Sequence, residues 1–171
     1  MLLAGCSTVG VPLMFHSPFS LPFLIIMYKI LFVCHGNICR SPMAEFIMKH
    51  LVNEAGRAGE FEIASAATST EELDNPVYPP ARRKLAEHGI SCEGKYARQL
   101  TRRDYDYYDL LIGMDSYNIR NMTRMCGGDP DGKIRMLLDR DVADPWYTDN
   151  FDATWRDCVK GCTELLKHIK R

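Results

Sequence analysis

Short apolar runs alternate with helical patterns along most of the chain, and this alternation constrains the fold more than any other feature. Residues 30–33 form a continuous apolar run, which is typical of a strand buried on both faces. A helical pattern opens at Pro42, and apolar residues then recur every four positions from Met43 to Leu51. Strands that alternate with helices in this way predict a three-layer α/β fold, with a parallel sheet between two layers of helices.

The alternation continues to the end of the chain. Further strands are predicted at residues 61–66, 110–114 and 134–138. Further helices are predicted at residues 79–88, shortly after residue 101, at residues 115–126 and at residues 151–169. In open parallel sheets, ligands bind beyond the carboxyl ends of the strands. We therefore expect the chemistry in the loops that follow the first and fourth strands.

The chain of 171 residues suits one domain, but the alternation begins only near Met27. Residues 1–26 are apolar and interrupted by three prolines, and no basic residue precedes their apolar stretch. They therefore match neither a signal peptide nor a membrane span. We predict a non-catalytic extension over residues 1–26, with a weak membrane-surface anchor as the alternative, and a single domain over residues 27–171.

Charge and cysteine content narrow the possible partners and the compartment. The formal net charge of −1 predicts no nucleic-acid partner, so any attraction for anions must come from a local site. The seven cysteines are odd in number and irregularly spaced, which indicates a cytoplasmic protein rather than a secreted disulfide framework. Cys158 and Cys162 share one helix face, and without a nearby histidine pair we interpret them as buried apolar residues rather than metal ligands.

The loop after the first predicted strand combines features of an anion-binding site. Residues 34–42 read Cys-His-Gly-Asn-Ile-Cys-Arg-Ser-Pro. A loop that wraps a tetrahedral anion must point several backbone N–H groups inward, and Gly36 and Asn37 tolerate the left-handed backbone that this requires. The following helix adds positive charge at its N-terminus, and Arg40 offers a planar fork that binds two phosphoryl oxygens. The loop therefore predicts a phosphate site.

The donors that bind phosphate also stabilise a thiolate at Cys34, where the loop begins. Ser41 can donate a further hydrogen bond to that sulfur. We therefore predict that Cys34 is a nucleophile aimed at phosphorus, with Arg40 stabilising the transition state. A lone cysteine is more often a core residue and a lone arginine a surface charge, but that interpretation leaves the combined strand, loop and helix unexplained.

Hydrolysis also needs an acid that protonates the leaving oxygen. Asp144 follows the fourth predicted strand and should therefore lie at the same edge of the sheet as Cys34. Pro145 restricts the backbone of Asp144, a constraint that Asp139 and Asp141 lack. We predict Asp144 as the general acid, although an Asp-Pro pair on its own also marks ordinary turns.

Two aromatic residues follow the predicted acid. Trp146 and Tyr147 can form a wall against the phenyl ring of an aryl phosphate. The alternative is that one of the two packs in the core.

The loop of residues 34–42, together with Asp-Pro-Trp-Tyr at residues 144–147, resembles the low-molecular-weight protein tyrosine phosphatases. The match continues in order through segments at residues 65–69, 75–76, 87–90, 97–99 and 114–115. It implies a parallel sheet with the strand order 2-1-3-4 and the phosphate loop between the first strand and the first helix. It also implies hydrolysis of phosphotyrosine proteins or small aryl phosphates through a cysteinyl-phosphate intermediate, without metal or cofactor. We expect a monomer or weak dimer.

The resemblance also implies roles for individual residues. The residues implied to brace the phosphate loop through hydrogen bonds are Asn37, Ser41, Ser65 and His88. Cys39 stands at the position where family members carry a second thiol, which can form a reversible disulfide with the residue at the position of Cys34. This arrangement fits a redox-sensitive nucleophile. The residues expected to bind the substrate are His35, Gly36, Asn37, Ile38, Cys39, Ser41, Trp146 and Tyr147. No chemical role is assigned to His35.

The segment after the second predicted strand departs from many family members. Residues 70–74 read Thr-Glu-Glu-Leu-Asp, with three acids and no aromatic residue. One aromatic wall is therefore expected to be missing, and acidic phosphopeptides are expected to bind less well.

Three other functions are weighed against phosphotyrosine hydrolysis. Relatives that act on phosphoarginine tend to carry threonine in place of Ile38 and a small residue in place of Trp146 or Tyr147. Thioredoxin-coupled arsenate reductases need a further cysteine pair, and residues 96–117 contain no cysteine. A non-catalytic phosphate-binding or redox-sensing module is the last alternative, although all three predicted catalytic residues are present.

Overall fold

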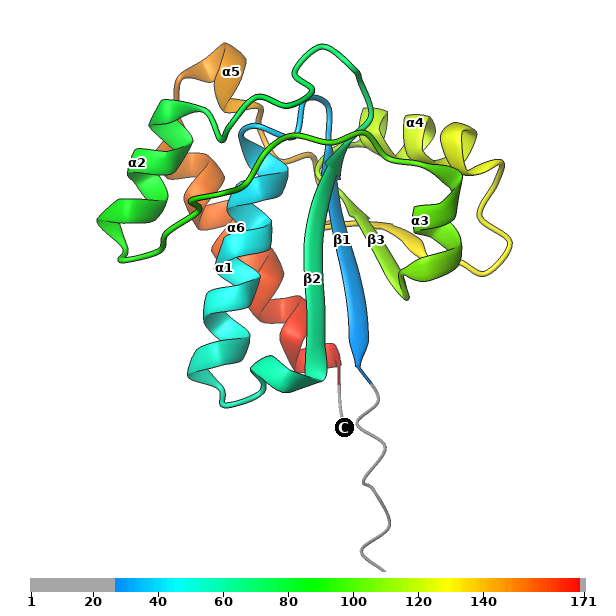
Figure 1. Cartoon of the computed structure of the whole chain (residues 1–171), viewed down its shortest axis with the longest axis horizontal. Coiled ribbons are helices and arrows are strands. Elements are labelled where there is room, and N and C mark those ends of the chain that lie inside the picture. The colour runs from blue at the N-terminus through cyan, green and yellow to red at the C-terminus, as the bar shows by residue number, and fades with distance from the viewer. Residues whose placement is uncertain (1–26, 170–171) are drawn as a thin grey trace, which may run out of the picture.

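The computed structural model describes residues 27–169, in which strands and helices alternate (Figure 1). The strands are β1 (Tyr28–Cys34), β2 (Phe61–Ala67), β3 (Leu110–Gly113) and β4 (Ile134–Met136). The helices are α1 (Arg40–Glu54), the 3₁₀ turn η1 (Ala58–Glu60), α2 (Pro79–Glu87), α3 (Arg102–Tyr107), α4 (Ser116–Cys126), α5 (Pro145–Thr148) and α6 (Phe151–His168). None of these helices is long and apolar enough to cross a membrane. The extension predicted over residues 1–26 lies outside the described residues.

The strands form one parallel sheet in the order β2-β1-β3-β4, which confirms the predicted topology. The register of β1 and β2 runs to the pair Cys34↔Ala67, so both strands end at the same edge. The chain passes from β1 outward to β2 and then crosses to β3 on the other side of β1. The strand order therefore reverses beside the end of β1, which is the place where this class of sheet binds ligands.

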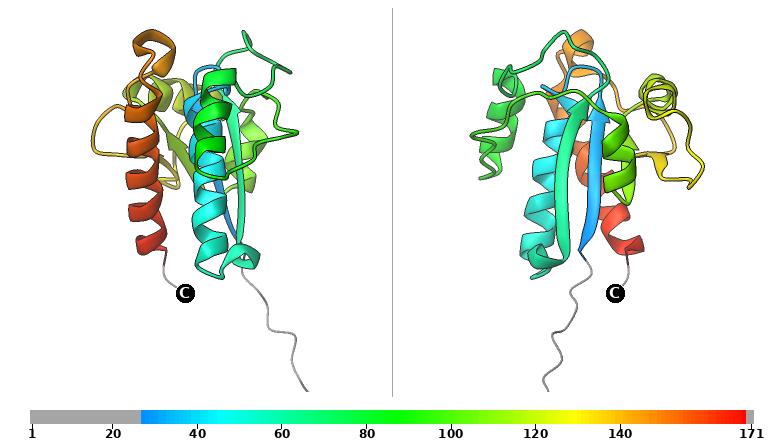
Figure 2. Two further views of the ribbon diagram at one scale, coloured as in Figure 1. Left: turned by 90° about the vertical axis from the view of Figure 1, so that its left-hand side faces the viewer. Right: turned by 45° about the vertical axis from the view of Figure 1, so that its right-hand side comes forward.

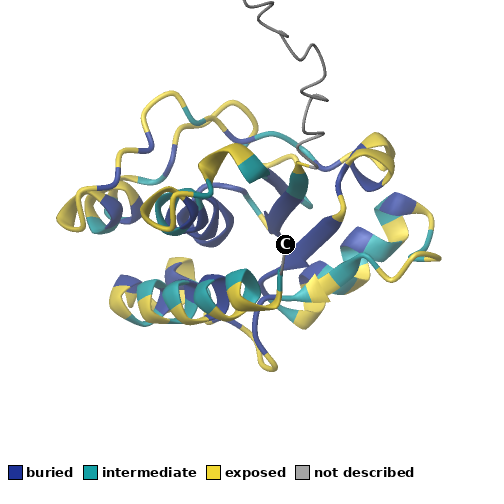
Figure 3. Ribbon diagram, turned by 90° about the horizontal axis from the view of Figure 1, so that it is seen from below, coloured by how far each residue is buried: buried dark blue, intermediate teal, exposed yellow. Residues whose placement is uncertain are grey.

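The side chains of β1 alternate between two hydrophobic cores. Ile30 and Phe32 belong to the core under α1 and α6, and α2 packs against both of these helices (Figures 1 and 2). Leu31 and Val33 belong to the core under α3 and α4. All four side chains are fully buried, and Figure 3 shows the buried residues gathered between the layers. The predicted three-layer arrangement is confirmed.

The end of the sheet differs locally from the prediction. The strand β4 ends at Met136, although the apolar run continues through Leu138. A Cβ atom on Gly161 of α6 would lie 2.4 Å from Cγ of Leu137, so helix and loop pack closely here. The backbone N–H of Leu137 still donates to the carbonyl of Gly113 in β3 at 3.0 Å, and the apolar side chains of Leu137 and Leu138 are buried against the helix layer.

Candidate active site

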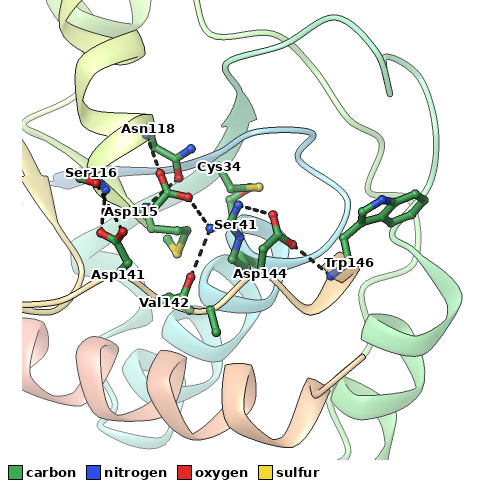
Figure 4. A network of polar contacts seen from close by, with 12 residues as sticks. Cys34, Ser41, Asp115, Ser116, Asn118, Asp141, Val142, Asp144 and Trp146 are labelled. Carbon is green, nitrogen blue, oxygen red and sulfur yellow. Dashed lines mark hydrogen bonds and ion pairs between the residues drawn. The ribbon is translucent and has the colours of Figure 1, made fainter. Parts of the chain in front are cut away.

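The loop between β1 and α1 closes around the sulfur of Cys34 (Figure 4). The Cys34 Sγ lies 3.0 Å from the Ser41 Oγ, and it accepts a hydrogen bond from the backbone N–H of Asn37 at 3.3 Å. Asn37 has a φ of 58°, so the loop does turn through a left-handed backbone at this position. The loop thus directs hydrogen-bonding groups at the sulfur, as an anion-binding loop directs them at its ligand.

Of the two residues expected to tolerate a left-handed or strained backbone, Gly36 does not adopt a left-handed one, because its φ is not positive. A Cβ atom at this position would lie 3.1 Å from the Cγ of Glu72 and 3.7 Å from the Cγ1 of Ile38. The missing side chain therefore makes room for Glu72, which packs over the loop.

Arg40 is the first residue of α1, and its buried guanidinium joins the loop to two acids (Figure 4). Its Nη1 donates to the Asp115 Oδ2 at 2.5 Å and to the carbonyl of Val142 at 3.2 Å. Its Nη2 donates to the Asp144 Oδ2 at 2.5 Å. Burial by itself would lower the pKa of Arg40, but the neighbouring Cys34 and the two aspartates outweigh it and raise that pKa. The cation is therefore held beside the sulfur.

Asp144 lies at the same edge of the sheet as Cys34, and hydrogen bonds position both of its carboxylate oxygens. The Oδ2 accepts from Arg40, and the Oδ1 accepts from the backbone N–H of Trp146 at 3.1 Å. The second bond caps α5, a short helix that replaces part of the predicted loop, with Pro145 in its first position. The helix cap and the ion pair together fix the direction of the carboxyl group.

A hollow of about 120 Å³ opens over Cys34, between the phosphate loop, Glu71 and Glu72 on one side and Asp144 and the aromatic pair on the other. Trp146 packs against Tyr78 with ring centroids 5.2 Å apart, and it remains 54% exposed. Tyr147 is 85% exposed. Neither aromatic residue is a core residue, so the alternative of core packing is wrong and both line the hollow.

Behind the loop, a chain of buried hydrogen bonds runs from the sulfur into α1. The Nδ2 of Asn37 donates to the Ser41 Oγ at 2.9 Å and to the Ser65 Oγ at 2.8 Å. The Ser65 Oγ donates in turn to the Glu45 Oε2 at 2.5 Å. The structure thus places three of the four residues implied to brace the loop in one network, and that network ends on a buried carboxylate.

The residues at the far end of this network, Glu45 and Lys95, were missed by the sequence analysis. The Lys95 Nζ lies 3.3 Å from the Glu45 Oε2 and donates to the carbonyl of Ser65 at 3.0 Å. Burial lowers the pKa of Lys95, while Glu45 opposes that effect. No local signal marks either residue, because an acid on a helix and a lysine in a loop are most often exposed.

Asp115 was predicted only as the start of the helix at residues 115–126 and as part of the matching segment at residues 114–115. It does cap α4, since its Oδ1 accepts from the backbone N–H of Asn118 at 2.6 Å. Its other oxygen binds Arg40. The signal was present in the sequence, because Asp115 lies two residues beyond the end of β3 and therefore reaches the same edge as Cys34.

His88 does not brace the loop as the resemblance implied. Its ring stacks on Trp155 of α6, with centroids 3.8 Å apart and an angle of 6° between the ring planes. The residue is exposed, and no hydrogen bond joins its ring to the phosphate loop in the described part of the chain. The reason is that α2 ends at Glu87 and packs against α6, which carries His88 away from the loop, while Lys95 occupies the position behind it.

The remaining loop residues surround the sulfur. Burial raises the pKa of the Cys39 thiol, and Cys34 and Asp144 add to the effect. Cys34 and Cys39 are both free thiols. The Nε2 of His35 lies 3.1 Å from the Glu71 Oε2 at the mouth of the hollow. Within residues 27–169, no group of three or more His, Cys, Asp or Glu side chains is placed to hold a metal ion.

Comparison with known proteins relates this geometry to a family. The sequence profile described as "Low molecular weight phosphotyrosine protein phosphatase" matches residues 29–171. The chain belongs to this family. The low-molecular-weight phosphatases similar to it are named protein-tyrosine-phosphatases, so the expectation of an enzyme of this class is confirmed.

Individual low-molecular-weight phosphatases match most of this chain and nearly all of their own length. The chain is 38% identical over 152 residues to the low molecular weight protein-tyrosine-phosphatase YfkJ of Bacillus subtilis, which covers 85% of this chain and 97% of the relative. The crystal structure of YfkJ matches with a TM-score of 0.81 at 39% identity, over 84% of this chain and 94% of that chain. The SP-PTP phosphatase of Streptococcus pyogenes gives a TM-score of 0.80 at 39% identity, over 85% and 95% of the two chains.

The low-molecular-weight phosphatase fold is also found in an enzyme named for another phospho-amino acid. The arginine phosphatase DARP of Drosophila matches with a TM-score of 0.76 at 27% identity, over 84% of this chain and 98% of that chain. The substrate must therefore be argued from the residues that line the site rather than from the fold.

Proposed function

We propose that the protein hydrolyses phosphotyrosine in proteins, and small aryl phosphates, with Cys34 as the nucleophile. Arg40 binds the phosphoryl group and Asp144 is the general acid and base. The observation that supports this most strongly is the surroundings of the Cys34 sulfur. Ser41 and the N–H of Asn37 contact it, while Arg40 binds the Asp144 carboxyl group at 2.5 Å at the same edge of the sheet.

In the first step, the Cys34 thiolate attacks phosphorus, a sulfur–phosphorus bond forms and the phosphorus–oxygen ester bond breaks. Arg40 and the inward N–H groups of the loop bind the phosphoryl oxygens, where charge develops in the transition state. Asp144 gives its proton to the leaving oxygen, so that the tyrosine departs as a neutral phenol.

In the second step, water attacks the phosphorus of the cysteinyl-phosphate. The Asp144 carboxylate accepts a proton from that water, the sulfur–phosphorus bond breaks, and the thiolate is restored as inorganic phosphate leaves. The overall reaction consumes one water and returns every protein group to its starting state.

The ion pair of Arg40 with Asp144 prepares this sequence. A phosphate dianion gives the guanidinium new acceptors, so Asp144 shares its cationic partner and gains an anionic neighbour. Substrate binding therefore loosens the ion pair and makes the Asp144 carboxyl group available to the leaving oxygen.

The lining of the hollow favours phosphotyrosine over phosphoarginine. Ile38, Trp146 and Tyr147 present apolar and aromatic surface beside Cys34, which suits a phenyl ring better than a guanidinium group held by hydrogen bonds. The apolar residue at position 38 and the aromatic pair are also the features that phosphoarginine-specific relatives are expected to lack.

The described cysteines support a cytoplasmic, redox-sensitive enzyme. All six are free and buried, as in proteins of a reducing compartment. A peroxide oxidises the Cys34 thiolate to a sulfenic acid, and the sulfur of that sulfenic acid can react with the Cys39 thiol. The Cys39 thiol attacks that sulfur, the disulfide forms and water leaves.

The proposal is tested by comparing rates on matched phosphotyrosine, phosphoserine and phosphoarginine peptides, with Cys34→Ser as the inactive control. We expect the phosphotyrosine peptide to be hydrolysed fastest and Cys34→Ser to hydrolyse none. Faster turnover of the phosphoarginine peptide would overturn the substrate assignment. Full activity of Cys34→Ser would overturn the assignment of the nucleophile.

A further inference from the structure

Two adjoining hollows form the mouth of the proposed active site. The first, of about 120 Å³, lies over Cys34. The second, of about 520 Å³, extends toward the start of α4. The residues that line both are His35, Arg40, Asp144 and Tyr147. A phosphotyrosine in the first hollow therefore places the neighbouring residues of its peptide against the rim that the two hollows share.

This mouth is strongly acidic. The acids that line the two hollows are Glu71, Glu72, Asp115, Asp141 and Asp144. Among the described lining residues, Arg40 is the only lysine or arginine. A bound phosphoryl group takes up the charge of Arg40, so the occupied site presents a negative rim to the rest of the peptide.

Three of the five acids already have partners within the protein. Asp115 and Asp144 bind Arg40. Asp141 accepts hydrogen bonds from the backbone N–H of Ser116, at 2.8 Å, and from its hydroxyl, at 3.3 Å, at the N-terminus of α4. These three carboxylates are therefore poorly placed to bind a cation on a peptide.

In the described part of the chain, Glu71 and Glu72 lack a permanent cationic partner. The Glu72 Oε2 accepts from the neutral side-chain amide of Asn75 at 2.8 Å. The Glu71 Oε2 contacts His35, which carries charge only when protonated, and the Glu71 side chain is 71% exposed. Glu72 also packs over Gly36 of the phosphate loop and lines the hollow over Cys34, where the phosphotyrosine is proposed to bind.

Tyr147 offers a second contact for a cation. Its ring is 85% exposed and borders both hollows. A lysine or arginine side chain that lies over an exposed aromatic ring gains a favourable cation–π contact. Carboxylates on one side of the mouth and an open aromatic ring on the other are together suited to a cationic side chain.

We propose that Glu71, Glu72 and Tyr147 select phosphotyrosine peptides that carry lysine or arginine next to the phosphotyrosine. This inference rests on the proposed function and names the substrate class within it. The attraction is between exposed groups, so salt screens it, and it acts on the peptide rather than on the phosphoryl group.

The test measures kcat/KM on three phosphotyrosine peptides that differ only in the residues beside the phosphotyrosine, which are lysine, glutamine or glutamate. At low salt we expect the order lysine, glutamine, glutamate, with about a fivefold ratio between the first and the last, since exposed ion pairs contribute modestly. Raising the salt concentration should reduce the ratio.

The variant Glu71→Gln/Glu72→Gln keeps the shape of both side chains and should bring the lysine-to-glutamate ratio to about one to two. The matched control is Glu54→Gln/Glu164→Gln, which removes the same charge at the far ends of α1 and α6, away from the mouth (Figure 1). We expect the control to keep the wild-type ratio.

Each outcome decides the proposal. Peptides hydrolysed at equal rates by the wild type, or a lysine preference that survives in Glu71→Gln/Glu72→Gln, would overturn the selection of basic peptides while leaving the proposed function intact. If the control loses the ratio as well, the preference comes from net charge and the assignment to these two residues is wrong. If no phosphotyrosine peptide is hydrolysed, the proposed function itself fails, and this inference with it.

Discussion

The Nη2 of Arg40 and the Oδ2 of Asp144 lie 2.5 Å apart, so the proposed phosphate ligand and the proposed acid are ion-paired before any substrate binds. The Nη1 of the same guanidinium is held by Asp115. A phosphoryl group that enters the loop must share this cation with Asp144. The geometry of the guanidinium fork, and not only its charge, should therefore determine activity.

Arg40→Lys tests that requirement. Lysine keeps the positive charge but cannot hold Asp115, Asp144 and two phosphoryl oxygens with one planar group. We expect kcat/KM on para-nitrophenyl phosphate to fall by about 10²-fold, as when one preorganised donor to a transition state is removed. Arg140→Lys, at an exposed position, is the control. An Arg40→Lys enzyme within twofold of wild type would show that charge alone suffices.

Asp144→Ala tests the acid through the leaving group. The activated leaving group of an aryl phosphate departs without a proton, whereas the leaving oxygen of an alkyl phosphate needs one. We expect the rate on alkyl phosphates to fall by about 10²-fold or more, and the rate on para-nitrophenyl phosphate to fall far less. Asp139→Ala, in the same loop but exposed, should affect both ester classes equally and weakly. An equal loss on both classes in Asp144→Ala would exclude this residue as the acid.

The pair of buried Glu45 and half-buried Lys95 should couple stability to activity. Glu45→Gln leaves the Lys95 ammonium without its carboxylate, at a cost of about 2–3 kcal/mol in the free energy of unfolding, because removing one partner strands a half-buried charge. Glu45→Gln should also lower kcat, because Ser65 loses the acceptor that orders the chain to Asn37 and Cys34.

The double variant Glu45→Gln/Lys95→Met supplies the control for that pair, because methionine removes the stranded charge. Urea unfolding of the two single variants, Glu45→Gln and Lys95→Met, and of the double variant should give a coupling energy between residues 45 and 95 of about 1 kcal/mol or more. Stability changes that add within about 0.5 kcal/mol would show that the two residues do not act together.

Asp104 should make part of the stability depend on pH. Burial by itself would raise its pKa, but hydrogen bonds from Arg98 and Thr101 outweigh burial and lower that pKa below its ordinary value. A folded pKa below the unfolded value of about 3.9 means that the ionised form stabilises the fold above that pH, and that this contribution is lost as the pH falls through the folded pKa.

The variant Asp104→Asn removes this contribution. We expect it to lower the free energy of unfolding by about 1–2 kcal/mol at pH 7, and the difference from wild type to shrink below pH 4. Urea unfolding at pH 7, 5 and 3.5 measures both. A difference that stays constant across this range would contradict the role of the carboxylate charge.

The main features of the site were predictable because they follow from the sheet. Parallel strands bring their carboxyl ends to one edge, so Cys34 at the end of β1 and Asp144 in the loop after β4 had to lie on the same side of the molecule. The composition of residues 34–42 added the chemistry. The strand order, by contrast, came from the resemblance, since no local pattern states which strands are neighbours.

The errors concern contacts between distant segments. His88 was expected behind the loop, but the packing of α2 on α6 stacks it on Trp155. Lys95 lies behind the loop instead, at a position set by how residues 89–96 return toward the sheet. Tyr96, next to it, forms an isolated bridge with Pro76 outside the sheet. Neither arrangement has a periodic signature, because both depend on side chains that meet only after the layers have assembled.

The covalent intermediate on Cys34 underlies every step proposed above. Turnover of a phosphotyrosine peptide is stopped by rapid denaturation, and the protein is digested and analysed by mass spectrometry and ³¹P NMR. We predict a phosphoryl group on the sulfur of Cys34, absent without substrate and absent in Cys34→Ser. Phosphate that never appears on that sulfur during active turnover, or that appears on another residue, would contradict the mechanism.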